Sequence, residues 1–368
     1  MLLGDIIFIA ERGRARASVL HGARSDLSLK RENVHRSLLK LRNAYRAYIK
    51  RGHCQAMLDR YNQMLGLRVT VAEFEHAKQL TACDEEEFFG YEFYRRTDEE
   101  RDAYLTRVRR NNLARKVGDV DEPLTIPGNK VLFNMHFGEF LRRRWINPTA
   151  VSAEEFAAFV RELGEVLVKP SIFCSGHGIY KYRYTDDASA RALYKELYGG
   201  GYVVEEVLKQ HPEMNRLNPH VINSVRVATY TDADEVHILA AAVRTSGHAE
   251  GCIDSLHAGG CACPVDAQTG VITADGFNND FVRFAEHPLT HIPFKGFQIP
   301  MWEEAIETVR AASRHAYELP QCRFLGWDLA FTPDGVAILE GNWKQGCDLI
   351  QYGQGGIYHQ LKQLTDKL

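Results

Sequence analysis

The sequence predicts an α+β protein preceded by a helical N-terminal region, and two observations support this fold class. At residues 121–130, DEPLTIPGNK, two prolines and a glycine end a helical pattern. From Val131 onward, short apolar runs alternate with amphipathic stretches, as in mixed α/β architectures. The chain has 368 residues, 45% of them hydrophobic, which is enough to build more than one core. We therefore expect a helical region at residues 1–115 and an α+β region at residues 116–368.

Two stretches of the N-terminal region have helical patterns. From Ser28 to about Leu67, apolar residues recur at gaps of three and four, which is one face of a helix, and basic residues surround them. Residues 85–115 contain no proline and are rich in Glu, Arg and Tyr, so we expect more helix there. The basic face is either solvated or docks onto a protein or carrier partner, and the sequence leaves both interpretations open.

The α+β region contains recognisable helices and strands. An amphipathic pattern begins after Ser152, a good N-cap residue, and two runs of strand-forming residues flank the turn TDAD as a hairpin. In chain order we expect a helix at 153–163, a strand at 165–169, a helix at 188–198, a strand at 202–207, a hairpin of 223–230 with 236–244, and a helix at 302–319.

Charge and targeting features argue against several classes of protein. The formal net charge is -3 and the pI is about 6.6, so no overall basicity attracts the chain to nucleic acid or anionic lipid. The apolar start MLLGDIIFIA contains Asp5, lacks a basic leader and is too short to cross a bilayer. We expect a cytoplasmic protein with no integral membrane segment and no nucleic-acid partner.

The eight cysteines are consistent with a reducing compartment. Cys252, Cys261 and Cys263 lie near His257, but their C-x-C spacing lacks the paired C-x2-C arrangement of structural zinc sites. We expect reduced thiols here rather than a metal site.

An acidic hairpin is expected at residues 324–342, FLGWDLAFTPDGVAILEGN. The segment TPDG suits a type I turn in which Gly335 is left-handed and forms a bulge. In that register Asp328 lies opposite Glu340, and Asn342 points to the same face. Opposed carboxylates repel unless a positive charge lies between them, and Mg²⁺ accepts such ligands together with phosphate. Solvated or salt-bridged carboxylates at the end of a sheet are the alternative.

A magnesium site of this kind implies bound phosphate, and two basic segments suit phosphate binding. Lys169 ends a strand, and the loop that follows contains Ser175, Gly176 and Gly178, whose backbone N–H groups can approach phosphate oxygens. Lys130, after a proline-glycine turn, is a second candidate. The loop matches neither of the common phosphate-binding motifs, and solvated lysines are the alternative.

Together these motifs resemble the ATP-grasp superfamily and, more narrowly, its sugar-transfer-associated group. Lys130, the glycine loop after Lys169, VVEEVLKQHPEMNRLNP, VINSVRVATY and GWDLAFTPDG...LEGN occur in the order seen in that family. The resemblance covers about residues 85–351 and implies an ATP-grasp fold, in which two α+β subdomains enclose ATP. It implies a lid subdomain at about 150–207 and a metal-binding C-terminal subdomain at about 208–368.

The resemblance also implies which residues bind ATP and Mg²⁺. Lysines would bind the phosphates, the glycine loop would cover them as a lid, a strand end would contact adenine through its backbone, and a carboxylate would bind the ribose. The implied residues are Lys130 and Lys169 for phosphate, Ser175, Gly176 and Gly178 for the lid, Glu205, Glu206 and Val207 for adenine, Glu213 for ribose, and Asp328, Glu340 and Asn342 for Mg²⁺.

The activity that the resemblance implies is that of a ligase. ATP would phosphorylate a small acid, such as an amino acid or a sugar acid, and an amine or another nucleophile would attack the acyl phosphate. Arg226 and Arg244 would stabilise the transferring phosphate or grip the acid, with structural salt bridges as an equal alternative. Asn223 would position phosphate or backbone. His257 and Lys344 are each open between a ligand contact and a structural role.

Two other interpretations remain open from the sequence. A kinase with the same nucleotide site would transfer phosphate to a hydroxyl, and a catalytically idle scaffold would bind a partner through its helical arm. A scaffold has no chemical need for paired lysines beside metal ligands, so the ligase interpretation leads.

Overall fold

The computed structural model describes residues 52–118, 126–172, 178–249, 256, 259–319, 322–343 and 345–367. The chain divides into two compact units, Met1–Arg60 and Tyr61–Leu368, and the second holds both β-sheets. The helix expected from Ser28 to Leu67 lies mostly outside the described residues. Within the described ranges, no helix has the length and apolarity that crossing a bilayer requires.

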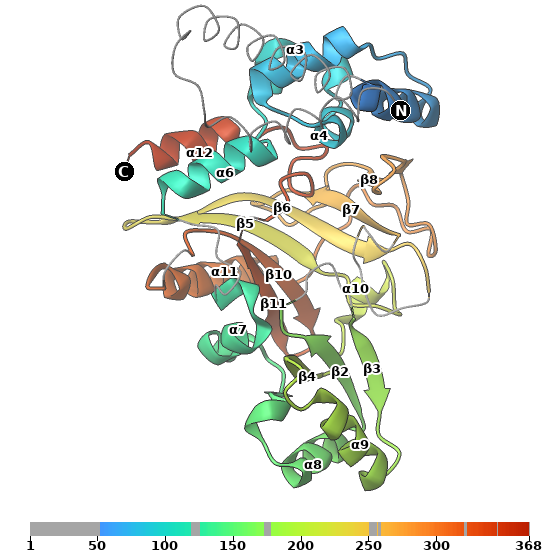
Figure 1. The fold of residues 1–368 in the computed structure, drawn as a ribbon, viewed down its shortest axis with the longest axis vertical. Helices are drawn as coiled ribbons and strands as arrows, with labels where there is room; N and C mark the ends of the chain where they lie inside the picture. The colour runs from blue at the N-terminus through green and yellow to red at the C-terminus, as the bar shows by residue number, and fades with distance from the viewer. Residues whose placement is uncertain are drawn as a thin grey trace, which may run out of the picture. The chain divides into compact units, whose positions relative to one another are not determined.

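The large sheet is antiparallel and has seven strands in the order β11-β10-β5-β6-β7-β8-β9 (Figure 1). The hairpin expected across TDAD is confirmed as β5 and β6, which pair from Val225 with Val243 to Thr231 with Val236. The strands are β5 (Val225–Thr231), β6 (Val236–Ser246), β7 (Gly260–Val265), β8 (Gly276–Phe277), β9 (Arg283–Phe284), β10 (Phe324–Thr332) and β11 (Gly335–Trp343).

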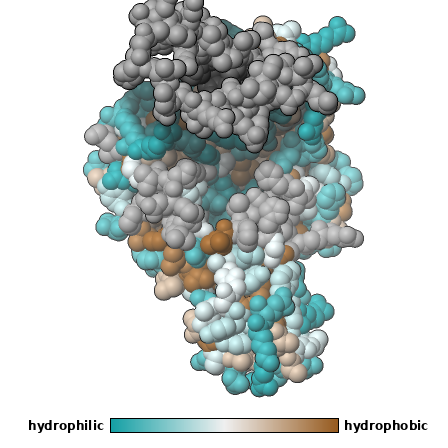
Figure 2. Space-filling model, in the orientation of Figure 1, coloured by the Kyte–Doolittle hydropathy of each residue, from teal (hydrophilic) through white to brown (hydrophobic). Residues whose placement is uncertain are grey.

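The small sheet has four strands in the order β1-β4-β2-β3, and two amphipathic helices cover it. The first helix starts where the sequence predicts because Ser152 forms a capping box with Glu155. The surface of this part of the molecule is mostly hydrophilic or neutral (Figure 2), as expected for the outer faces of such helices. The elements are β1 (Trp145–Ile146), α8 (Ala153–Leu163), β2 (Glu165–Pro170), β3 (Tyr180–Arg183), α9 (Asp187–Leu197) and β4 (Tyr202–Glu206).

One face of the large sheet packs against α7 (Lys130–His136) and α11 (Trp302–Tyr317) and forms the main core. Trp327 of β10 is buried there, and its indole N–H donates to Ser313 Oγ of α11 at 2.8 Å. The helix expected at 302–319 is thereby confirmed. Cys261 and Cys263 of β7 are free thiols buried in this core.

The opposite face of the large sheet is apolar in one part and polar in another. Phe324 and Asp328 lie an even number of residues apart on β10, so both point to this face. The apolar part, with Phe324, packs under α6 (Arg107–Lys116) and α12 (Tyr358–Thr365), which lie together in Figure 1. Helices α6 and α12 therefore cover the apolar part of this face, and the polar part that contains Asp328 lies further along the same strand.

The helix expected over residues 85–115 is present, and the structure divides it into several short helices. Each α-helix begins at its own N-cap, which is Asp84, Thr97 or Thr106, and each cap side chain accepts a hydrogen bond from a backbone N–H three residues later. The helices of this region are α3 (Val71–Thr81), α4 (Glu85–Gly90), the 3₁₀ helix η2 (Phe93–Arg95), α5 (Asp98–Asp102) and α6.

Gln351 joins these helices to the C-terminal segment. Its buried side-chain N–H groups donate to Tyr91 Oη at 3.1 Å and to the Leu105 and Cys347 carbonyls at 3.0 Å. Its Oε1 accepts from Leu105 N at 2.8 Å and from Ile357 N at 3.1 Å. One side chain thus satisfies backbone groups from two segments that lie far apart in the sequence.

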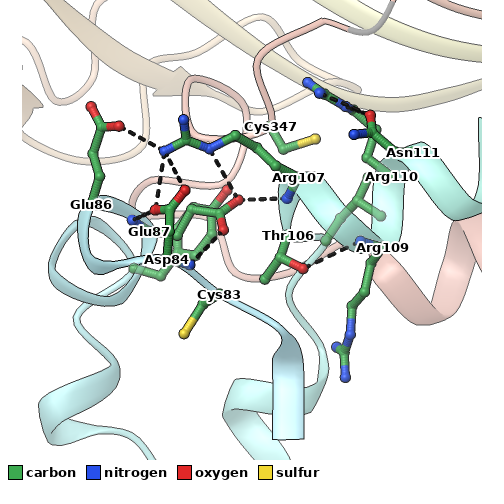
Figure 3. A network of polar contacts seen from close by, with 12 residues as sticks. Cys83, Asp84, Glu86, Glu87, Thr106, Arg107, Arg109, Arg110, Asn111 and Cys347 are labelled. Carbon is green, nitrogen blue, oxygen red and sulfur yellow. Dashed lines mark hydrogen bonds and ion pairs between the residues drawn. The ribbon is translucent and has the colours of Figure 1, made fainter. Parts of the chain in front are cut away.

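Figure 3 shows an ionic cluster where α4 and α6 begin. The buried Glu87 carboxylate accepts a hydrogen bond from Arg107 N at 2.5 Å. The Arg107 guanidinium lies 2.9 Å from Asp84 and 2.6 Å from Glu86. Burial, together with the nearby Asp84 charge, raises the pKa of Glu87 to about 7.

Glu87→Gln is expected to change how stability depends on pH. Between the ordinary pKa of 4.5 and about 7, folded Glu87 keeps a proton that the unfolded chain releases, so the free energy of unfolding falls as pH rises through this window. Glutamine does not ionise, so its free energy of unfolding should lack this fall. Relative to wild type, the free energy of unfolding of the variant should therefore rise by on the order of 1 to 3 kcal/mol when the pH is raised from about 5 to about 8. Urea unfolding at both pH values measures the gain. The exposed Glu86→Gln is the control, and an equal gain in both variants would contradict the assignment.

Candidate functional site

A cleft of about 360 Å³ lies between the small sheet and the segment that follows it. Its lining includes Lys169 of β2, Lys181 of β3, Glu205 and Glu206 of β4, Val207, and Leu339 of β11. The sequence-predicted phosphate lysine and the predicted adenine segment therefore line one cavity. Leu339 belongs to the acidic hairpin, so the hairpin borders the same cavity.

Glu205 is the buried centre of the cleft wall. It lies opposite Leu167 in the β2–β4 ladder, which makes Lys169 its diagonal neighbour, and Lys169 Nζ is 2.6 Å from its carboxylate. Arg143 and Asn134 also donate to this carboxylate, at 2.9 Å each. Burial alone would raise the pKa of Glu205, but the Arg143 and Lys169 charges outweigh it and hold the pKa well below its ordinary value. An ionised carboxylate thus fixes the direction of the Lys169 side chain.

The acidic hairpin has the pairing of Asp328 with Glu340 that the sequence predicts, but its bulge lies at a different position. Asp328 lies opposite Glu340, and Asn342 lies opposite Gly326. The expected bulge at Gly335 is absent from this hairpin, because Gly335 pairs directly with Thr332. The register instead shifts between Asp328 and Leu329, which leaves Leu339 as the extra residue directly before Glu340.

Asp328 is held by both predicted arginines. Its side chain is 1% exposed and accepts hydrogen bonds from Arg226 Nε and from Arg226 Nη2, the latter at 2.9 Å, and Arg244 Nη2 lies 3.0 Å away. Arg226 is the cross-strand partner of Asp328 on β5, which brings the two side chains to one face. Burial would raise the pKa of Asp328, but the Arg226 and Arg244 charges lower it to about 2. Both arginines are therefore ion-paired, as the structural alternative expected, and both lie within the candidate site.

The predicted metal ligands are close enough to act together. Asn342 Nδ2 donates to Asp328 Oδ2 and to Glu340 Oε1, at 3.3 Å each. Two carboxylates and an amide form an oxygen-rich donor set that suits Mg²⁺, once the amide turns to present its oxygen. No cluster of three or more His, Cys, Asp or Glu side chains suited to a metal occurs in the described part of the chain, and this site has two such residues and an asparagine.

Asn223 is buried within the wall of the cleft. Its side-chain N–H groups donate to Gln210 Oε1 at 3.0 Å and to the Met214 and Asn218 carbonyls at 2.9 Å. Its oxygen accepts from Thr245 Oγ1. Gln210 lines the cleft, so the hydrogen bonds of Asn223 connect it to the cleft wall through residues 210–218.

Several predicted residues lie outside the group that lines the cleft, and others lie outside the described residues. Glu213 is half-exposed and pairs with Arg216 at 2.8 Å. Lys130 begins α7, and its backbone N–H donates to Ser171 O at 2.8 Å, which places it beside the start of the expected lid. Gly178 has a positive φ of 74°, and a Cβ there would lie 2.9 Å from the Pro170 ring. Ser175, Gly176, His257 and Lys344 lie outside the described residues.

The family comparison decides the fold. The model of the sugar-transfer associated ATP-grasp family matches residues 143–366. The chain belongs to the sugar-transfer associated ATP-grasp family. The expected resemblance and the ATP-grasp fold are thereby confirmed, and of the predicted site residues Lys130 alone precedes the matched range. No curated protein matches this ATP-grasp chain.

Solved structures similar to this ATP-grasp protein include two synthetases and a ligase. D-alanyl-alanine synthetase A from Vibrio cholerae O1 biovar eltor str. N16961 is 13% identical, with a TM-score of 0.39, over 66% of this chain and 65% of that chain. D-cycloserine synthetase DcsG is 14% identical (TM-score 0.37; 66% and 70%). VanG D-Ala:D-Ser ligase from Enterococcus faecalis is 14% identical (TM-score 0.38; 66% and 61%). The chain thus spans less than two thirds of the Vibrio and Enterococcus proteins.

Proposed function

We propose that this ATP-grasp protein is an ATP-dependent ligase that joins a small carboxylic acid to an amine or another nucleophile. One observation carries the proposal: the acidic hairpin borders the cleft that Lys169 lines. Leu339 belongs to both, because it lines the cleft and directly precedes Glu340 in the hairpin. ATP in the cleft would extend its phosphates from Lys169 toward the carboxylates. The acid would be an amino acid or a sugar acid.

The wall of the cleft supplies the groups that would hold ATP. The backbone of Glu205, Glu206 and Val207 lies at the end of β4 and would contact adenine, while Lys169 would bind phosphate. Lys130 is bonded through its backbone to Ser171, so both lysines lie at the base of the expected lid. In this proposal Glu205 orients Lys169, because the Lys169 ammonium lies 2.6 Å from its carboxylate.

Asp328, Glu340 and Asn342 would hold Mg²⁺, which supplies neutralising charge for phosphate oxygens when it is bound. Arg226 and Arg244 lie against Asp328 and would stabilise the charge that spreads over the transferring phosphoryl group, or bind the acid. In the first step an acid oxygen would bond to the γ-phosphorus as the bond to the β,γ-bridging oxygen breaks, and ADP would leave. The nucleophile would then attack the acyl carbon, inorganic phosphate would leave, and the nucleophile would lose a proton to solvent.

A product assay with a substrate panel tests this proposal. The full chain is mixed with ATP, Mg²⁺, hydroxylamine and either amino acids or sugar acids, and ADP, AMP and hydroxamate are quantified. ADP and hydroxamate formed in equal amounts are expected. AMP would indicate adenylation, and a stable phosphorylated hydroxyl compound would indicate a kinase; either product would contradict the ligase proposal.

A further inference from the structure

Three consecutive arginines, Arg142, Arg143 and Arg144, precede β1, and only the middle side chain is buried. The Arg143 side chain is 2% exposed, whereas those of Arg142 and Arg144 are 46% and 47% exposed and form surface ion pairs with Glu304 and Glu162. A buried guanidinium is costly unless its donors are satisfied.

Every N–H donor of the Arg143 guanidinium has an acceptor. Nε and Nη2 bind the two oxygens of Glu205, at 2.9 and 3.1 Å. Nη1 donates to Leu141 O at 3.3 Å and to Ile338 O at 2.7 Å. Nη2 also donates to Leu339 O at 2.9 Å. One planar group therefore binds a carboxylate on the small sheet and two carbonyls on the large sheet.

The acceptors connect both halves of the candidate nucleotide site. Glu205 lies 2.6 Å from Lys169 Nζ, and Leu339 is the bulged residue that directly precedes Glu340. A bulged residue leaves the regular strand pairing, and here Arg143 binds the carbonyl of that residue. Movement of Arg143 would therefore disturb the expected phosphate lysine and an expected metal ligand at the same time.

We propose that Arg143 is a positioning residue of the nucleotide site, which fixes Lys169 through Glu205 and Glu340 through the Leu339 carbonyl. The inference rests on the proposed function, since it takes the ligand to be a magnesium-bound nucleotide. The role requires the forked guanidinium, because the ammonium of a lysine cannot bind a carboxylate bidentately and reach two carbonyls together.

Calorimetric titration with ADP, in Mg²⁺ and in EDTA, tests the proposal on the full chain. Arg143→Lys should bind ADP with Mg²⁺ about 10-fold or more weakly than wild type. The Mg²⁺ gain, which is the ratio of the ADP affinity in Mg²⁺ to that in EDTA, should also be smaller than in wild type. Arg144→Lys, one residue away, is the matched control and should stay within about twofold of wild type on both measures. A purely structural role would leave the Mg²⁺ gain unchanged.

The outcomes separate this inference from the proposed function. A folded Arg143→Lys variant with wild-type affinity, or with the wild-type Mg²⁺ gain, would overturn the role of Arg143 while leaving the nucleotide site intact. If wild type itself fails to bind ADP with Mg²⁺, the proposed function fails and the inference fails with it. If circular dichroism shows that Arg143→Lys is unfolded, Arg143→Met with Glu205→Met replaces the ion pair by apolar side chains that preserve packing. That double variant should show the same two losses, and wild-type values would overturn the proposal.

Discussion

Glu340→Gln is expected to lower kcat by a factor on the order of 10³ while the protein remains folded. The substitution keeps the size of the side chain but removes the charge of an expected Mg²⁺ ligand. Glu340 is only partly buried and accepts a hydrogen bond from Asn342 Nδ2 at 3.3 Å, which the oxygen of a glutamine side chain can also accept, so little stability depends on its charge. The rate of ADP formation in the presence of the acid substrate measures the effect.

The control for this experiment is Glu304→Gln, which alters a surface carboxylate paired with Arg142. It should retain wild-type turnover, and thermal unfolding should show Glu340→Gln within about 1 kcal/mol of wild type. Near-normal turnover of Glu340→Gln would mean that this carboxylate does not serve the reaction.

Asp328→Asn is expected to destabilise the fold by about 3 to 5 kcal/mol, in contrast to the Glu340 variant. The Asp328 carboxylate is 1% exposed and neutralises Arg226, which is itself buried, and Arg244. A neutral amide leaves these cationic side chains without their anion. Urea unfolding at neutral pH measures the loss, and turnover should fall as well because the same carboxylate belongs to the expected metal site.

Asp334→Asn, in the exposed turn of the same hairpin, is the matched control and should change stability by less than about 0.5 kcal/mol. An Asp328→Asn variant as stable as this control would show that the two arginines do not depend on Asp328. Their proposed placement in the site would then lack its structural support.

Local sequence signals were sufficient to predict the hairpin and much of the α+β order. Alternating side chains and the TPDG turn predicted that Asp328 faces Glu340, and the register bears this out. The position of the bulge was missed, because the same pairing results from an extra residue at Gly335 or at Leu339. The observed register places the extra residue at Leu339, whose carbonyl accepts a hydrogen bond from Arg143, a residue outside the hairpin.

The role of Arg143 could not be predicted from sequence, because three adjacent arginines are locally equivalent and burial selects one of them. The breaks in the helical region are different, since their signals were present. Thr97 precedes Glu100 by three residues, and Asp84 precedes Glu87 in the same way, which are capping-box spacings that mark new helix starts.

A crystal structure of the full chain with ADP and Mg²⁺ tests the central claim most directly. We predict adenine against the backbone of Glu205 to Val207, the phosphates beside Lys169, and a magnesium ion bound by Asp328, Glu340 and Asn342. Nucleotide bound outside the cleft that Leu339 lines, or an ion held by other side chains, would contradict the account.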